Sequence, residues 1–146
     1  MSNSFDERSQ LPFQHPAAEE IRRLMDGRDW SAGAARRDRY LWLIWAFETQ
    51  VMNGGIDAFV FNDTGENAKE TRDALWDIGA DKSYLLLGQA CGLFPDGEPA
   101  RDHEQRRRQL KEITGDNGYL DELVDGEIEY DLYQKLLDYW NAADPG

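Results

Sequence analysis

Apolar residues recur at helical spacing along most of the chain, beginning with a short segment at residues 17–25. A second, longer helix is predicted from about residue 31 to about residue 52. Within it, residues 40–47 are apolar on every side, and a helix without a polar face belongs in the middle of a bundle. We therefore predict that residues 40–47 form a central core helix in which Trp42 and Trp45 are largely buried.

An Asn-Gly-Gly sequence at residues 53–55 interrupts this pattern. Adjacent glycines readily adopt the left-handed conformation that ends a helix. The residues that follow are ambiguous, because their Phe and Val content favours a strand, whereas Ile56, Phe59 and Val60 fit the spacing of a short helix. A hairpin turn at the Asn-Gly pair is disfavoured because the preceding residues are helical in pattern. We predict a short helix over residues 56–62.

Turn-forming residues divide the remainder of the chain into further helices. These are predicted at residues 66–78, 81–94, 101–113 and 119–142. The last stretch is predicted to break near Gly126. Residues 1–16 contain two prolines and little pattern, so we predict a flexible N-terminal arm. The sequence shows no repeat and no credible strand pair, and it predicts an all-α fold, a compact array of six to eight helices in a single domain over residues 17–146.

The composition is that of a folded domain without cross-links. A chain of 146 residues with 40% hydrophobic and 12% aromatic residues can bury a sizeable core. Cys91 is the one cysteine, so no intramolecular disulfide can form, and its apolar surroundings predict a small core residue and not a nucleophile. Residues 1–10 are polar, so we expect no secretory signal there, and no apolar run approaches the roughly 20 residues that span a bilayer. We expect a bacterial, cytoplasmic protein with no membrane partner.

Charge is distributed unevenly over the chain, whose formal net charge is −13. Residues 1–40 hold seven acidic and seven basic residues, whereas residues 112–146 hold ten acidic residues and one basic residue, a net charge of −9. Such a field repels nucleic acid and anionic membranes and attracts basic partners. The alternative is that the charge serves solubility alone. We predict binding to a basic protein and no direct binding to nucleic acid.

The predicted partner-binding carboxylates lie close together in the sequence. They are Asp116, Asp121, Glu122, Asp125, Glu127, Glu129 and Asp131. Within this set, Asp121 with Asp125 and Glu127 with Asp131 have the i, i+4 spacing that places two charges on one face of a helix. Asp73 and Asp77 are spaced in the same way.

The sequence offers little for catalysis. His15 lies in the predicted arm and His103 on a charged helix, and neither belongs to a His-x-x-x-His or Cys-x-x-Cys pair, so no metal site is predicted. Phosphate-binding and dinucleotide-binding glycine motifs are also missing, and we predict a protein that is not an enzyme and has no cofactor. Glu48, close to Asn53, is expected to accept backbone N–H groups of the glycine turn or to pair with an arginine. The alternative is a site carboxylate beside a glycine loop.

One string of residues resembles a known family. Glu48, the segment Asn-Gly-Gly-Ile-Asp-Ala-Phe at residues 53–59, and Phe-Asn-Asp-Thr-Gly at residues 61–65 are similar to the signature of the bacterial DNA-mimic protein (DMP) family. The resemblance covers roughly residues 40–140. It implies an α-helical fold and, as in the family's named member, an acidic surface that imitates DNA and engages a DNA-binding protein, specifically a transcription factor.

Most of this signature is expected to form the fold and not the binding surface. We interpret as structural the residues Glu48, Asn53, Gly54, Gly55, Asp57, Asn62 and Gly65. The chain departs from the family pattern at Ala58, where a glutamine is usual, and at Val60, where an aromatic residue is usual. Any specific role of that glutamine does not carry over to this chain.

Several functions are consistent with these features. The first is a DNA mimic that engages a basic DNA-binding protein such as a transcription regulator. The second is an immunity or antitoxin-like inhibitor of a basic toxin, the third an enzyme with a site around Glu48 and Asn53, and the fourth an acidic domain with a purely structural role. Self-association as a homodimer is left open.

Overall fold

The computed structural model describes residues 16–31 and 33–143, and all regular structure in these residues is helical. The α-helices are α2 (Pro16–Met25), α3 (Arg36–Phe61), α4 (Ala68–Asp77), α5 (Asp81–Gly92), α6 (His103–Thr114) and α7 (Leu132–Ala142). The short 3-10 helices are η2 (Asp63–Asn67), η3 (Pro95–Gly97) and η4 (Leu120–Glu122). The all-α prediction is confirmed. The predicted arm lies, except for its last residue, outside the described residues.

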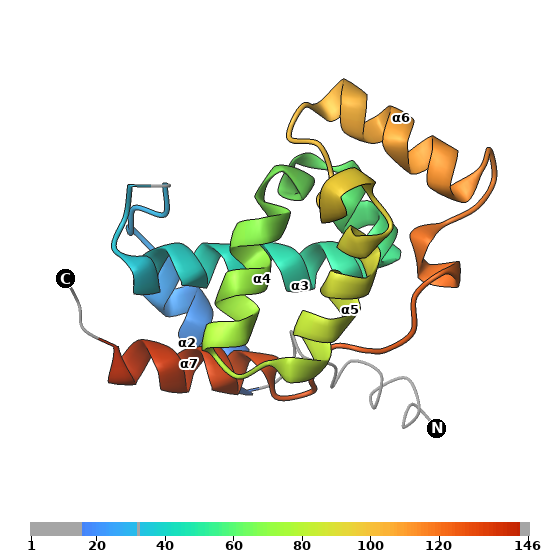
Figure 1. Ribbon diagram of the computed structural model, residues 1–146. Helices are drawn as coiled ribbons and strands as arrows, with labels where there is room; N and C mark the ends of the chain where they lie inside the picture. Colours follow the sequence, from blue (N-terminus) through green and yellow to red (C-terminus); the bar gives the residue numbers. More distant parts are fainter. Residues whose placement is uncertain (1–15, 32, 144–146) are drawn as a thin grey trace.

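Helix α3 is the centre of the array, as its apolar sequence predicts. It passes behind α4 and α5 in Figure 1, while α2 and α7 lie side by side below it and α6 covers its far end. Leu41, Ile44 and Phe47 are completely buried on α3. Phe47 packs edge-to-face on Phe59 with a centroid separation of 5.3 Å, which joins the two halves of the helix.

The two tryptophans of this helix are less buried than predicted. Trp42 and Trp45 are only partly buried, and each has an arginine guanidinium over its ring, Arg39 at 5.2 Å from the centroid of Trp42 and Arg22 at 5.4 Å from that of Trp45. Neighbouring helices cover only part of the circumference of α3. The guanidinium groups of these two arginines lie over ring surface that the helices leave uncovered.

The two adjacent glycines bend α3 without ending it in a separate loop. Gly54 has φ −153° and ψ 20°, and Gly55 has φ 77° and ψ −175°, so both lie outside helical geometry. Helical structure resumes at Ile56 and continues to Phe61. The predicted break and the predicted short helix are both confirmed, and the strand alternative is excluded for these residues.

Residues 119–142 were predicted to form one or two helices with a break near Gly126; the break is confirmed, but the part before it does not form an α-helix. Only η4 is helical there, residues 124–129 have no helical structure, and α7 begins at Leu132. Gly126 has φ 139°, which no α-helix contains. Asp121 with Asp125, and Glu127 with Asp131, are therefore not paired on the face of one helix. Helical spacing failed here because the segment is held by contacts with distant elements, described below.

No described helix combines the length and the apolar character that crossing a membrane requires.

Cys91 is completely buried on α5, as predicted for a core residue. Burial raises the pKa of its thiol to about 11, and the neighbouring Arg72 only partly opposes this effect. Because the thiolate is the reactive form, we expect negligible reaction of the native protein with a thiol reagent such as DTNB at neutral pH, and complete reaction after denaturation. Rapid labelling under native conditions would contradict this assignment.

Candidate functional site

The glycine bend of α3 is closed by two aspartates that bind each other's segments. The carboxylate of Asp121 accepts hydrogen bonds from the backbone N–H groups of Ile56 at 2.8 Å and Asp57 at 3.3 Å. In return, the carboxylate of Asp57 accepts a 2.9 Å bond from the N–H of Leu120. A Cβ atom at Gly55 would overlap the Asp121 carboxylate, so this position requires glycine for space as well as for its positive φ.

These contacts give Asp57 and Asp121 structural roles. Burial raises the pKa of the Asp57 carboxyl, the bond from Leu120 acts in the opposite direction, and the nearby charge of Asp121 adds to the increase. The backbone N–H groups at the start of the second half of α3 have no acceptor within the helix itself, and the Asp121 carboxylate accepts their hydrogen bonds. Asp57 belongs to the set predicted to be structural, whereas Asp121 was predicted to bind a partner.

The second half of the signature surrounds a buried arginine. Arg106 on α6 is completely buried, and its guanidinium donates to the carbonyl oxygens of Val60 at 2.7 Å and Asn62 at 3.0 Å. It also donates to the carbonyls of Ala100 at 2.9 Å and Arg101 at 3.0 Å. Burial lowers the pKa of this guanidinium, and surrounding carboxylates oppose the decrease.

Gly65 and Asn62 shape the cradle that receives Arg106. A Cβ atom at Gly65 would overlap both the Val60 carbonyl oxygen and the Arg106 side chain. The Asn62 side chain donates a 2.7 Å bond to Gln50, so its amide holds the end of α3 against an earlier turn. The sequence alone did not identify Arg106 as the buried member of the Arg-Arg-Arg run. Its i, i+4 spacing to Leu110, also buried, is the signal that was available.

Glu48 is completely buried, and its Oε1 accepts a 2.8 Å hydrogen bond from the hydroxyl of Tyr133 on α7. The Tyr133 hydroxyl was not among the predicted partners, which were the glycine-turn amides or an arginine. Burial, followed by the charge of Glu48, raises the pKa of Tyr133. Glu48 and Asn53 line one pocket of about 240 Å³, whose other lining residues are Arg22, Trp45, Thr49 and Met52. This lining contains no histidine or cysteine that would act with Glu48 in catalysis.

Glu129 is also engaged inside the molecule. Only 6% of its surface is exposed, and its carboxylate accepts bonds from the N–H groups of Lys82 at 2.7 Å and Ser83 at 3.1 Å and from the Ser83 hydroxyl at 2.6 Å. These amides lie in the first turn of α5, where the helix leaves its N–H groups without intrahelical partners. Glu129 therefore caps α5, and its carboxylate is not available at the surface.

The other five predicted partner-binding carboxylates lie at the surface and cap no distant helix, and we call them the acidic strip. They are Asp116, Glu122, Asp125, Glu127 and Asp131. The strip follows the segment that runs from the end of α6 around the side of the molecule to the start of α7 (Figure 1). Its carboxylates stand mainly on irregular backbone, not on a long helix, and they are held in place by the capping contacts of Asp121 and Glu129.

Lysines approach three carboxylates of the strip at long distances. Lys111 lies 3.6 Å from Asp116, Lys82 lies 3.9 Å from Glu127, and Lys135 lies 3.8 Å from Asp131. Surface pairs of this kind contribute about 0–1 kcal/mol, so they leave the carboxylates open to a stronger partner. The described residues contain no group of three or more His, Cys, Asp or Glu side chains arranged to hold a metal ion.

The fold and the surface together define an acidic helical domain whose central helix is bent at paired glycines. Residues 33–143 match the family model described as DMP19-like protein, and the chain belongs to this family. The resemblance inferred from the signature is thereby confirmed. No curated protein and no solved structure shows a recognisable match to the chain.

Proposed function

We propose that this protein is a DNA mimic whose acidic strip engages the DNA-binding surface of a basic protein such as a transcription regulator. The observation that carries the proposal is the concentration of charge, ten acidic residues against one basic residue in residues 112–146, with the five carboxylates of the strip at the surface. Membership of the DMP19-like family supports a role of this type.

The physical basis is competition for a phosphate-binding surface. A DNA-binding protein presents lysine and arginine side chains that neutralise phosphates, of which duplex DNA carries one per about 1.7 Å of axis. Clustered carboxylates attract the same side chains, accelerate association and accept charge-assisted hydrogen bonds from them. The field at the strip is reinforced by the net charge of −13 on the whole chain.

The test compares two variants with equal changes in charge. The first neutralises four of the five carboxylates of the strip with Asp116→Asn, Glu122→Gln, Asp125→Asn and Glu127→Gln. The matched control neutralises four exposed acids elsewhere, with Glu19→Gln, Asp26→Asn, Asp96→Asn and Glu104→Gln. Each protein is used for affinity capture from the native host at low and high salt, and the affinity of the captured protein is then measured.

We expect neutralisation of the strip to weaken binding by about tenfold or more, and the control to retain most of it, because surface charges act mainly over short range in salt. Duplex DNA should displace the captured protein, and rising salt should weaken the complex steeply. A captured toxin that DNA does not displace would support the inhibitor alternative instead. Equal recovery by both variants would show that the acidic strip serves solvation alone.

A further inference from the structure

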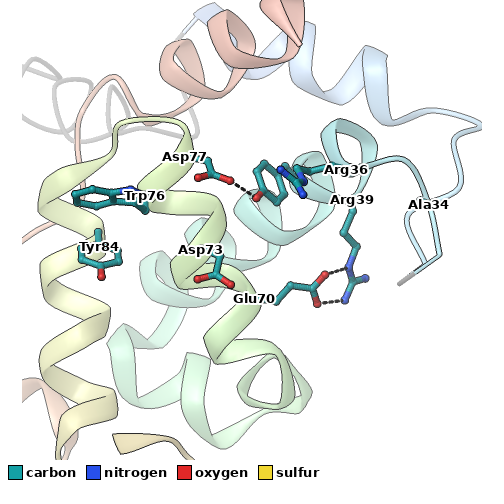
Figure 2. A pocket seen from close by; sticks show the side chains of 9 residues that line it. Ala34, Arg36, Arg39, Glu70, Asp73, Trp76, Asp77 and Tyr84 are labelled. Atoms are coloured by element: carbon teal, nitrogen blue, oxygen red, sulfur yellow. Dashed lines mark hydrogen bonds and ion pairs between the residues drawn. The ribbon is translucent and has the colours of Figure 1, made fainter. Parts of the chain in front are cut away.

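A pocket of about 560 Å³ opens between the start of α3, α4 and the beginning of α5, and no residue of the acidic strip lines it. Figure 2 shows its arrangement: the rings of Trp76 and Tyr84 form one end, Asp73 and Asp77 project from α4 in the middle, and an arginine–glutamate pair forms the other end. The pocket thus combines an aromatic wall with carboxylates that lie next to it.

Trp76 is unusually exposed for a side chain of its size. It remains 61% exposed although its ring lies against Tyr84 with a centroid separation of 5.1 Å. An indole in water leaves a large apolar surface and a π face without a partner. Trp76 and Tyr84 form a preorganised wall, because they stand on adjacent rigid helices and not on a loop.

Other tryptophans of this chain show what such a ring binds. Trp42, Trp45 and Trp140 each carry at least one arginine guanidinium over the ring, and the shortest of these contacts is Arg37 at 3.7 Å from the centroid of Trp140. In the part of the chain that the structure describes, no arginine is placed over Trp76.

The charges around the pocket determine which ligand it can accept. Glu70 is occupied by a two-bond contact with Arg39, at 2.8 and 2.9 Å, and this contact lowers the pKa of the Glu70 carboxyl. Asp77 accepts a hydrogen bond from the Tyr40 hydroxyl. Asp73, three residues before Trp76 on the same helical face, is 60% exposed and has only an exposed lysine 3.5 Å away.

We propose that this pocket binds the guanidinium group of an arginine side chain from a polypeptide partner. The planar guanidinium stacks on the open face of Trp76, and its N–H groups donate to Asp73, which lies about one helical turn earlier on α4. Arginine fits better than lysine because its flat, weakly hydrated guanidinium stacks on aromatic rings. It also donates two parallel hydrogen bonds to one carboxylate. The site is separate from the acidic strip, and it does not depend on the partner being a DNA-binding protein.

The positive charge of Arg36 in this pocket allows a test of whether the ligand is a cation or an anion. Arg36 is exposed and lines the same pocket. A cationic ligand is repelled by Arg36, whereas an anionic ligand would be attracted by it. Arg36→Gln should therefore strengthen the binding of an arginine side chain, and Asp73→Asn should weaken it.

The experiment titrates the isotopically labelled full chain with the peptide acetyl-Gly-Arg-Gly-amide at constant ionic strength. The matched probe is the same peptide with citrulline, which replaces the guanidinium by an uncharged group of nearly the same shape. We expect the arginine peptide to shift the indole N–H signal of Trp76, and the citrulline peptide to bind several-fold more weakly. The Trp76→Ala variant lacks this indole, so its titration is monitored by the amide signals of α4. Its affinity for the arginine peptide should be about two- to fivefold lower.

Two further variants distinguish binding in this pocket from nonspecific apolar binding and from binding at the acidic strip. Leu85→Ala removes another exposed apolar side chain, 62% exposed and outside the pocket lining, and should bind the peptide as the wild type does. The variant with the neutralised acidic strip should also retain peptide binding, so that failure of the proposed function and failure of this site are distinguishable.

Three results would overturn the proposal. Equal binding of the arginine and citrulline peptides would show that charge is not recognised. A second such result is that free arginine binds more tightly than the peptide and loses that advantage in the Arg36→Gln variant. This result would indicate a site for a small zwitterion and not for a side chain. No movement of the Trp76 signal at the highest soluble peptide concentration would show that the pocket does not bind guanidinium.

Discussion

Replacing Arg106 with methionine is expected to destabilise the protein by about 3–4 kcal/mol. Its guanidinium donates to four backbone carbonyls, and two of these, Val60 and Asn62, belong to the end of α3 and the residue after it. Methionine fills much of the space but donates no hydrogen bond. Each of the four carbonyls therefore loses the hydrogen bond that offsets the free-energy cost of removing it from water. The free energy of unfolding is measured by chemical denaturation followed by circular dichroism.

The neighbouring arginines provide a matched control. Arg107 and Arg108 are exposed, and Arg107 pairs with Glu104 on the surface of the same helix. Arg107→Met and Arg108→Met should each change stability by less than about 0.5 kcal/mol. Similar losses for all three arginines would show that Arg106 does not tie α6 to α3 in the way described.

Replacing Glu129 with alanine is expected to cost about 2–4 kcal/mol of stability while leaving the acidic strip intact. The buried carboxylate accepts three hydrogen bonds from Lys82 and Ser83, and its loss leaves two amides of the first turn of α5 without an acceptor. Bonds to a charged acceptor at a helix N-terminus are among the stronger ones in proteins. Thermal and chemical denaturation would both report the loss.

Glu127 is the comparison for Glu129, since it lies two residues earlier and its side chain is 78% exposed. Glu127→Ala should leave stability within about 0.5 kcal/mol of the wild type, because an exposed pair at 3.9 Å contributes little. Its effect is expected on partner binding instead. If Glu127→Ala destabilised the protein as much as Glu129→Ala, the division of this segment into capping and surface carboxylates would be wrong.

Much of the architecture was predictable from local sequence pattern. Helical spacing located the main helices, the apolar run at residues 40–47 identified the central one, and the paired glycines Gly54 and Gly55 located its bend. These features are local, because each depends on which side chains share a helical face or on the conformations open to glycine. The same signature was sufficient to indicate the family that the chain belongs to.

The roles of individual charged residues were decided only by the tertiary structure. Asp121 and Glu127 have the same formal charge and lie in the same acidic segment, yet Asp121 binds backbone amides 64 and 65 residues away in the sequence and Glu127 faces solvent. Arg106 differs from Arg107 only in the direction it faces, and its partners on the α3 side are 44 and 46 residues away. Composition and spacing reveal how much charge a segment carries. They do not reveal which carboxylate meets an unpaired amide, because that amide belongs to another element and is brought near only when the helices pack.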